Sequence, residues 1–253
     1  MLNYDRKQVT MVHRWLMPAV LFVFIVMASQ ADIWTEVLGK GQGKVPFGWS
    51  LTFITDTLKS DAALLTAPVL CAFPYASVMI DELRSGMVKA VLTRTDRQHY
   101  ISSKAAACLV SGALEEAVSV GLLSLVVCLI FMPMETVAEA GMNQNEMVRL
   151  LIGQLCRYSC YGALWSLAGL AISLLTMNRM MAWVGPFIVN YLLVIVYERY
   201  FDVFKLLYPK EWLLGEWAWP MADAGICIWI VLLCLVFYLI ILSVGKRVLY
   251  HTL

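Results

Sequence analysis

The stretch DELRSGMVKAVLTRTDRQHYISSK, from Asp81 to Lys104, is a short charged island in a very apolar chain. It holds eight formal charges in twenty-four residues. The segments on either side, AALLTAPVLCAFPYASVMI and AAACLVSGALEEAVSVGLLSLVVCLIFM, are among the most apolar of the whole sequence. Long apolar segments joined by a charged connector are typical of membrane-spanning helices joined by a loop in water.

The composition of the whole chain indicates the same solvent. Of its 253 residues, 61% are hydrophobic and only 15% are charged, and the mean hydropathy is +0.74. Soluble globular domains are nearer half apolar and a quarter charged. We therefore expect a membrane protein, with a lipid bilayer around it and no nucleic-acid partner.

The seven cysteines all lie in apolar segments, where cysteine is a small packing residue. Cys156 and Cys160 share a helix face, but no histidine or carboxylate completes a set of metal ligands beside them. We therefore expect no metal site.

A helix needs roughly twenty apolar residues to cross a bilayer, and six segments meet this need approximately. They predict an all-α polytopic fold, a single transmembrane domain over residues 1–253 with spans at about 15–30, 62–80, 105–133, 147–177, 180–197 and 223–245. The loop before the last span, YPKEWLLGEWAWPM from Tyr208 to Met221, is rich in tryptophan and predicts a re-entrant or interfacial pair of short helices.

The lysines and arginines of the loops indicate the orientation. With both termini in the cytoplasm, eleven of them fall on the inner side and seven on the outer side. Because positive residues favour the cytoplasmic side, we expect a multi-pass protein of the cell membrane with both termini inside. The charged segment 81–104 then faces the cytoplasm.

The pattern within this segment predicts an amphipathic helix from about Asp81 to Thr93. Leu83, Met87 and Val91 recur every four residues, while Arg84 and Lys89 fall elsewhere on the helix. Thr95 or Asp96 then caps a new helix that continues into the third span. One interpretation is a solvated connector; another is a surface that docks on a partner or on anionic lipid.

Glu82, Gly86, Lys89 and Leu92, followed by Arg97, Tyr100 and Lys104, resemble the cytoplasmic coupling segment of ABC-2 type permeases. In that family a run of the form E-x-x-x-G…L…R-x-x-Y/I…K follows the second of six spans. The resemblance extends to the six-span topology and to the Pro/Trp-bearing loop before the last span. The sequence departs from the family at Thr95-Asp96, where Pro or Ser often makes the turn.

The resemblance implies the transmembrane subunit of an ATP-binding cassette exporter, working as a homo- or heterodimer with two copies of a cytoplasmic ATPase. ATP and Mg would bind to that ATPase, and this chain itself would bind no cofactor. The coupling helix would contact the ATPase through Met87 and Val91, with Arg84 and Lys89 facing acidic partners. The set of coupling residues implied for this chain is Glu82, Arg84, Gly86, Met87, Lys89, Val91, Arg97, Tyr100 and Lys104.

We find no motif that predicts catalysis by this chain. GKGQGKVPFG, from Gly39 to Gly48, is not a P-loop, because Leu38 replaces the first glycine and Val45 replaces the hydroxyl residue. His-Glu-x-x-His and Gly-x-Ser-x-Gly do not occur in the sequence. We therefore expect a protein that is not an enzyme, with ATP hydrolysis in a separate subunit.

Three charges fall at membrane depth. Glu115 and Glu116 lie roughly 16–18 Å along the helix beyond Lys104, at about 1.5 Å per residue, and Arg157 lies in the fourth span. Charged residues inside a span cost on the order of 2.5–3.5 kcal/mol to insert. They predict either an interhelical ion pair between Arg157 and one glutamate or a polar translocation path.

Two other classes of function are compatible with the same pattern. The chain could be a stand-alone immunity or sensor protein that acts through its outer loops. It could also be an ion-coupled carrier that uses the three intramembrane charges. The sequence does not identify the cargo, for which a peptide, an antibiotic or another amphipathic molecule is our expectation.

Overall fold

The computed structural model describes residues 12–39, 45–135, 144–200, 205–215, 219 and 223–252. The regular structure within these ranges is helical, and one isolated bridge joins Val45 to Glu135. The α-helices are α2 (Val12–Ser29), α3 (Ala31–Gly39), α4 (Trp49–Leu58), α5 (Asp61–Leu70), α6 (Val78–Arg84), α7 (Met87–Leu92), α8 (Arg97–Phe131), α9 (Gln144–Thr176), α10 (Arg179–Tyr200), α11 (Pro209–Leu214) and α12 (Asp223–Thr252). Two 3₁₀ turns, η1 (Met132–Met134) and η2 (Lys205–Leu207), complete the order.

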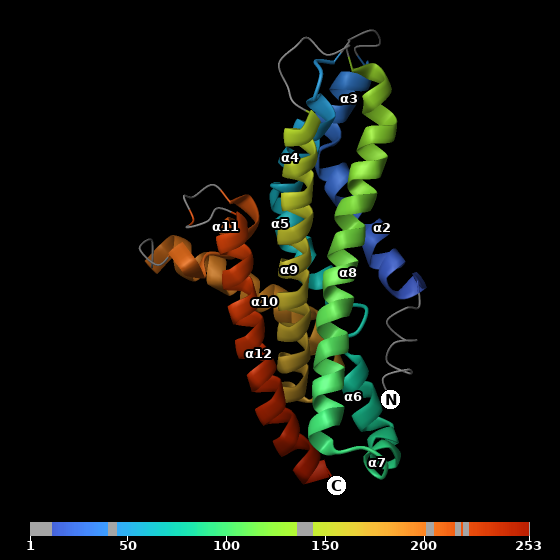
Figure 1. The fold of residues 1–253 in the computed structure, drawn as a ribbon, viewed down its shortest axis with the longest axis vertical. Coiled ribbons are helices and arrows are strands. Elements are labelled where there is room, and N and C mark those ends of the chain that lie inside the picture. Colours follow the sequence, from blue (N-terminus) through green and yellow to red (C-terminus); the bar gives the residue numbers. More distant parts are fainter. Residues whose placement is uncertain are drawn as a thin grey trace.

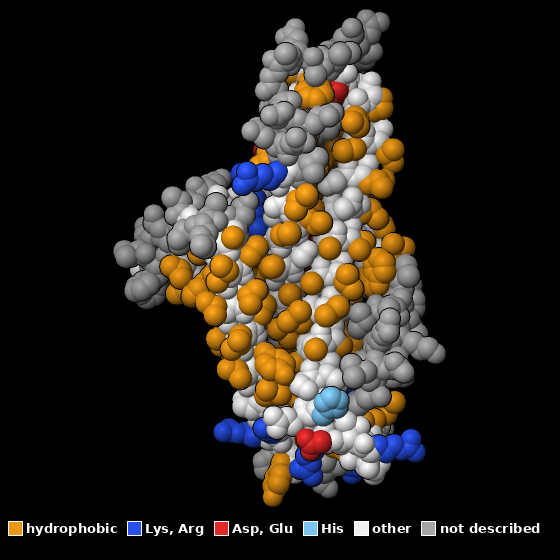
Figure 2. Space-filling model, in the orientation of Figure 1, with side chains coloured by type: hydrophobic (Ala, Val, Ile, Leu, Met, Phe, Trp, Pro, Cys, Tyr) orange, Lys and Arg blue, Asp and Glu red, His pale blue; other side chains and the backbone are white. Residues whose placement is uncertain are grey.

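Four helices of the described part, α8, α9, α10 and α12, are long and apolar enough to cross a membrane. The number becomes five if α2 and α3, which meet at an angle of 71°, are taken as one broken span. The predicted helices at 180–197 and 223–245 are therefore present within α10 and α12, and those at 105–133 and 147–177 are present as α8 and α9, which end at Phe131 and Thr176. The apolar side chains spread over the middle of the visible face, and lysines and arginines gather at its lower end (Figure 2).

Helix α9 is the centre of the bundle. It packs against α8, α12 and α10, and it runs beside α8 along the long axis of the molecule (Figure 1). In the apolar 18-residue stretch of α9, 72% is buried inside the protein. The buried share of the corresponding stretch is 28% in α8, 28% in α10 and 22% in α12. The other long helices thus expose most of their apolar surface, as helices facing lipid do.

Small residues bring α8 and α9 unusually close. A Cβ built on Gly112 would lie 2.5 Å from the carbonyl oxygen of Gly162, and one built on Gly162 would lie 2.5 Å from the carbonyl oxygen of Gly112. One turn away, the Ser166 hydroxyl donates to the Cys108 carbonyl at 3.0 Å. These small residues are therefore used for packing within one chain, where they give van der Waals contact that larger residues would prevent.

The second predicted span, 62–80, is not one helix. Helix α5 ends at Leu70, and a series of turns over residues 71–77 leads into α6. Pro68 lies inside α5, and Pro74 lies within the turns. Because proline has no N–H and disfavours a helical residue before it, the backbone changes to bonds such as Phe73 N–H to Leu70 C=O at 3.2 Å.

The segment between α10 and α12 partly agrees with the predicted pair of short helices. It contains η2 and α11, while Trp217 and Met221 lie outside the described residues. The Lys210 ammonium lies 3.4 Å from Asp61 and 3.7 Å from Glu198, so α11 is tied to both α5 and α10.

The hydroxyl of Tyr208 donates to the Glu198 carboxylate at 3.2 Å in the same region. Burial and the nearby negative charge of Glu198 raise the pKa of Tyr208 to about 12. Because the phenol must be neutral to donate, this contact is retained below the ordinary pKa of tyrosine, about 10, and is lost as the pH rises through about 12.

We expect Gly112→Ala to destabilise the bundle by about 1–3 kcal/mol, the usual effect of overpacking a close contact. The new methyl group would meet the backbone of α9, which cannot move aside cheaply. Thermal unfolding of the detergent-solubilised protein measures the effect. The control is Gly121→Ala in the same helix, where a Cβ meets nothing within 4 Å. Equal melting temperatures for both variants would contradict the close α8–α9 contact.

Candidate coupling site

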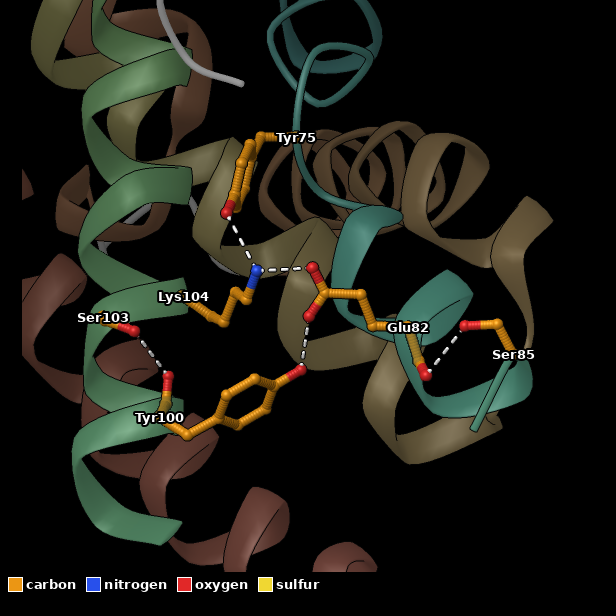
Figure 3. A network of polar contacts seen from close by, with 6 residues as sticks. All are labelled: Tyr75, Glu82, Ser85, Tyr100, Ser103 and Lys104. Atoms are coloured by element: carbon orange, nitrogen blue, oxygen red, sulfur yellow. Dashed lines mark hydrogen bonds and ion pairs between the residues drawn. The ribbon is translucent and has the colours of Figure 1, made fainter. Parts of the chain in front are cut away.

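A buried ion pair fastens α6 to α8. The Lys104 ammonium lies 2.6 Å from one carboxylate oxygen of Glu82, and the hydroxyl of Tyr100 donates to the other oxygen at 2.7 Å. The two charged side chains are 0% and 9% exposed. Figure 3 shows Glu82 pointing from α6 between the two residues of α8. Both carboxylate oxygens are thus satisfied, which an ion pair out of water requires.

Tyr75, in the turns before α6, completes this cluster. Lys104 approaches its hydroxyl at 3.4 Å and lies 5.7 Å from the ring centroids of both Tyr75 and Tyr100. Two aromatic faces beside an ammonium add cation–π attraction, which is larger where water is excluded. We call Tyr75, Glu82, Tyr100 and Lys104 the anchor cluster.

A second set of contacts fastens α6 to the turn between α9 and α10. The Arg84 guanidinium donates to the carbonyl of Met177 at 2.8 Å. Arg179, the first residue of α10, lies 3.7 Å from the Asp81 carboxylate. These side chains are more exposed than the anchor cluster, so each contact contributes less to stability.

The predicted continuous helix from Asp81 to Thr93 is two helices. Gly86 has a φ of +73° and separates α6 from α7. This left-handed conformation costs a residue with a side chain roughly 1–2 kcal/mol, so glycine permits the bend. We call α6, the turn at Gly86 and α7 together the arm; it lies at the same end of the bundle as the end of α12 (Figure 1).

Helix α7 presents both apolar and basic side chains at the surface. Met87 is 42% exposed, and Lys89 and Arg94 are exposed as well. A hollow of about 510 Å³ lies inside the bend of the arm, with Glu82, Met87, Val91 and Arg94 in its wall. The arm therefore offers a concave surface with an apolar rim and positive charge.

The predicted apolar stripe is only partly available to a partner. Val88 is buried, and Leu83, Val91 and Leu92 pack against the chain's own core. Met87 is the member of the stripe that remains exposed, while Val91 lines the hollow from its partly buried position.

The helix start that the sequence placed at Thr95 or Asp96 is found at Asp96, which occupies the N-cap position of α8 in extended conformation. Its side chain makes no capping hydrogen bond. Arg97 is exposed, and its guanidinium lies 5.9 Å from the ring centroid of Tyr250 in α12. Arg97 thus links the start of α8 to the end of the chain rather than to the arm.

The three intramembrane charges do not come together as one alternative predicted. Glu115 and Glu116 are wholly buried. Ser119 donates to one oxygen of Glu115 at 2.9 Å, whereas the other oxygen and both oxygens of Glu116 have no hydrogen-bond partner. The Arg157 guanidinium lies against Gly215 at the end of α11. The predicted ion pair between Arg157 and Glu115 or Glu116 is therefore not formed, and the polar path stays a prediction.

Sequence reasoning missed two contributors to the site. Tyr75 precedes Glu82 by seven residues and would have shared its helix face, but no charge or spacing marked it as a partner of Lys104. Arg94 was counted only as a loop charge, although it lines the hollow. A lysine and a glutamate at the two ends of one loop were the available signal for the ion pair.

Comparison with known protein families, with curated proteins and with solved structures finds no match to this chain.

We expect Lys104→Met to destabilise the protein by about 3–5 kcal/mol, because Glu82 would keep its charge in a buried site without its cation. The double variant Glu82→Gln with Lys104→Met should recover much of this loss, since Tyr100 can still donate to the amide oxygen. Thermal unfolding in detergent measures both. Lys89→Met, at an exposed lysine of α7, is the control and should stay within about 0.5 kcal/mol of the parent. A double variant no more stable than Lys104→Met would contradict a buried pair.

Proposed function

We propose that this chain is the permease subunit of an ABC exporter and that the arm is the element on which a separate cytoplasmic ATPase acts. The substrate class we favour is a peptide, an antibiotic or another amphipathic molecule. Two permease subunits would pair, and two ATPase copies with ATP and Mg would bind at the end of the bundle that carries the arm.

The observation that supports this proposal most is the contrast between the two halves of the arm. Helix α6 is fixed to α8 through Glu82 and Lys104, whereas α7 extends beyond it with Met87 exposed. A firmly held base with a partly exposed, partly apolar tip is suited to receive a force and to pass it on. Movement of such an element would carry the start of α8 with it, as packed helices move by small rigid shifts.

The distribution of charge supports a cytoplasmic position for the arm. Lysines and arginines gather at the lower end of the visible face (Figure 2), where the arm and the end of α12 also lie. By the positive-inside rule this end would face the cytoplasm. With α5, the turns and α6 counted as a broken second span, the proposal includes six spans and both termini inside.

The test is co-purification from the native cells. We expect Met87→Glu to abolish capture of a nucleotide-hydrolysing partner, because a charge would replace the exposed apolar residue of α7. Membrane insertion should be unchanged, since Met87 makes no part of the anchor cluster. Mass spectrometry of the captured proteins identifies the ATPase and measures its yield.

The matched control is Arg247→Glu, which places an acid at an exposed position of α12 at the same end of the bundle. It should retain the ATPase at the parental yield. Capture of the ATPase by the Met87→Glu variant at full yield would count against the arm, and its absence from the parental complex would count against the exporter.

A second candidate function rests on the buried glutamates. Glu115 and Glu116 are shielded from water, and three of their four oxygens lack a partner. Carboxyl groups in such a position are typical of proton or cation binding in carriers. An ion-coupled carrier would therefore use these residues directly.

Transport in vesicles separates the two candidates. The exporter predicts uptake into inverted vesicles that requires ATP and continues when an uncoupler abolishes the proton gradient; Glu116→Gln should leave that dependence on ATP intact. A carrier would instead lose transport with the gradient, and Glu116→Gln would abolish it. Transport that needs the gradient and ignores ATP would refute the exporter.

A further inference from the structure

The hollow inside the bend of the arm carries an uncompensated positive charge. Arg94 lines this hollow and is exposed, and within the described part of the chain no carboxylate forms an ion pair with its guanidinium. Glu82 also lines the hollow, but Lys104 lies 2.6 Å from one of its oxygens and Tyr100 donates to the other at 2.7 Å. The charge of Glu82 is thus already balanced, and that of Arg94 is available to a partner.

The rest of the wall has no charge. Met87, Ala90 and Val91 contribute apolar groups, and Thr93 and Thr95 contribute hydroxyl-bearing side chains. The volume of about 510 Å³ falls within the roughly 300–1,000 Å³ of sites that enclose a bound group. An apolar wall beside one cation fits an occupant that has an apolar group next to a carboxylate.

Arg94 takes the role that the sequence assigned to Arg84. The Arg84 guanidinium donates to the carbonyl of Met177 at 2.8 Å, so this side chain fastens the arm to its own chain. Lys89 is exposed but does not line the hollow. Arg94 lies between the end of α7 and Asp96, the N-cap residue of α8. A partner that binds Arg94 therefore holds the chain directly before α8.

We propose that the hollow receives a short segment of the ATPase, in which a carboxylate pairs with Arg94 and a neighbouring apolar side chain packs against Met87 and Val91. This inference rests on the function proposed above and names the contact by which the ATPase holds the arm. The apolar wall favours a protein segment over a small anion, because a small anion would leave Met87 and Ala90 in water. Opposite charges facing each other across an interface also determine which partner is accepted.

The two kinds of contact transmit force in different directions. Apolar packing against Met87 and Val91 passes on a push toward the bundle, whereas an ion pair at Arg94 resists separation. The ATPase would therefore pull the arm as well as push it, and the start of α8 would follow both movements as packed helices do.

The first test measures binding between the detergent-solubilised full chain and the ATPase subunit purified from the parental complex. Arg94→Glu should weaken this binding about tenfold or more, because repulsion replaces the attraction between opposite charges. The matched control is Arg247→Glu at an exposed position of α12 at the same end of the bundle, which should keep the parental affinity. An equal loss in both variants would reduce the effect to general electrostatic attraction and overturn the proposal.

A second pair of variants tests the hollow without changing any charge. Ala90→Trp fills the space from its wall and should weaken binding of the same ATPase about tenfold or more, because the segment would no longer fit. Gln98→Trp adds the same bulk at an exposed position of α8 that does not line the hollow, and it should leave the affinity unchanged. Parental affinity of the Ala90→Trp protein would show that nothing enters the hollow.

The third test identifies the residue that occupies the hollow. Arg94→Lys retains the charge and supplies an amine, which a carbodiimide joins to a touching carboxylate as an amide with loss of water. Mass spectrometry of the treated complex should find position 94 joined to an aspartate or glutamate of the ATPase. A product at Lys89 with none at position 94 would contradict the assignment.

These tests separate the two levels of the account. A parental chain that purifies without an ATPase refutes the exporter itself. A parental complex that contains the ATPase, together with full affinity in the Arg94→Glu and Ala90→Trp variants, refutes the hollow as the contact and leaves the exporter standing.

Discussion

The ion pair between Glu82 and Lys104 is the constraint on which the geometry of the arm depends. Two opposite charges lie 2.6 Å apart with almost no exposure to solvent, and two tyrosines complete their contacts. Because either charge alone would be costly in this position, α6 is held at one place on α8. That position in turn determines where Gly86 bends the chain and where α7 emerges. The exposed tip thus depends on a buried base.

Helix α6 connects the arm with the rest of the bundle. Arg84 and Asp81 fasten α6 to the turn between α9 and α10, and α8 is locked to the central α9 by the close contact at Gly112 and Gly162. A shift of the arm would therefore reach α8 and α10 through packed or hydrogen-bonded contacts. In the proposed exporter, these contacts would carry a movement of the arm to the spanning helices.

The long helices could be predicted from the sequence because their apolar runs are long, as in α8 and α12. The start of α8 at Asp96, inside the charged segment, was likewise predicted. The turns over residues 71–77 could not be predicted, because a proline does not by itself mark the end of a helix. Pro68 lies inside α5, whereas the chain around Pro74 forms turns. Gly86 was noted only for its resemblance to a family pattern, and its positive φ was not predicted. The position of Arg157 against Gly215 rather than beside Glu115 or Glu116 depends on where α11 lies, which residue spacing does not reveal.

The most direct measurement of the central claim places a photo-crosslinking amino acid at position 87 and irradiates intact native cells. The account predicts a cross-linked product with a cytoplasmic ATPase, strongest while the cells are actively hydrolysing ATP on the complex, and no labelling of position 87 by a membrane-impermeant reagent added outside. Cross-links to lipid alone, or ready labelling of position 87 from the exterior, would contradict it.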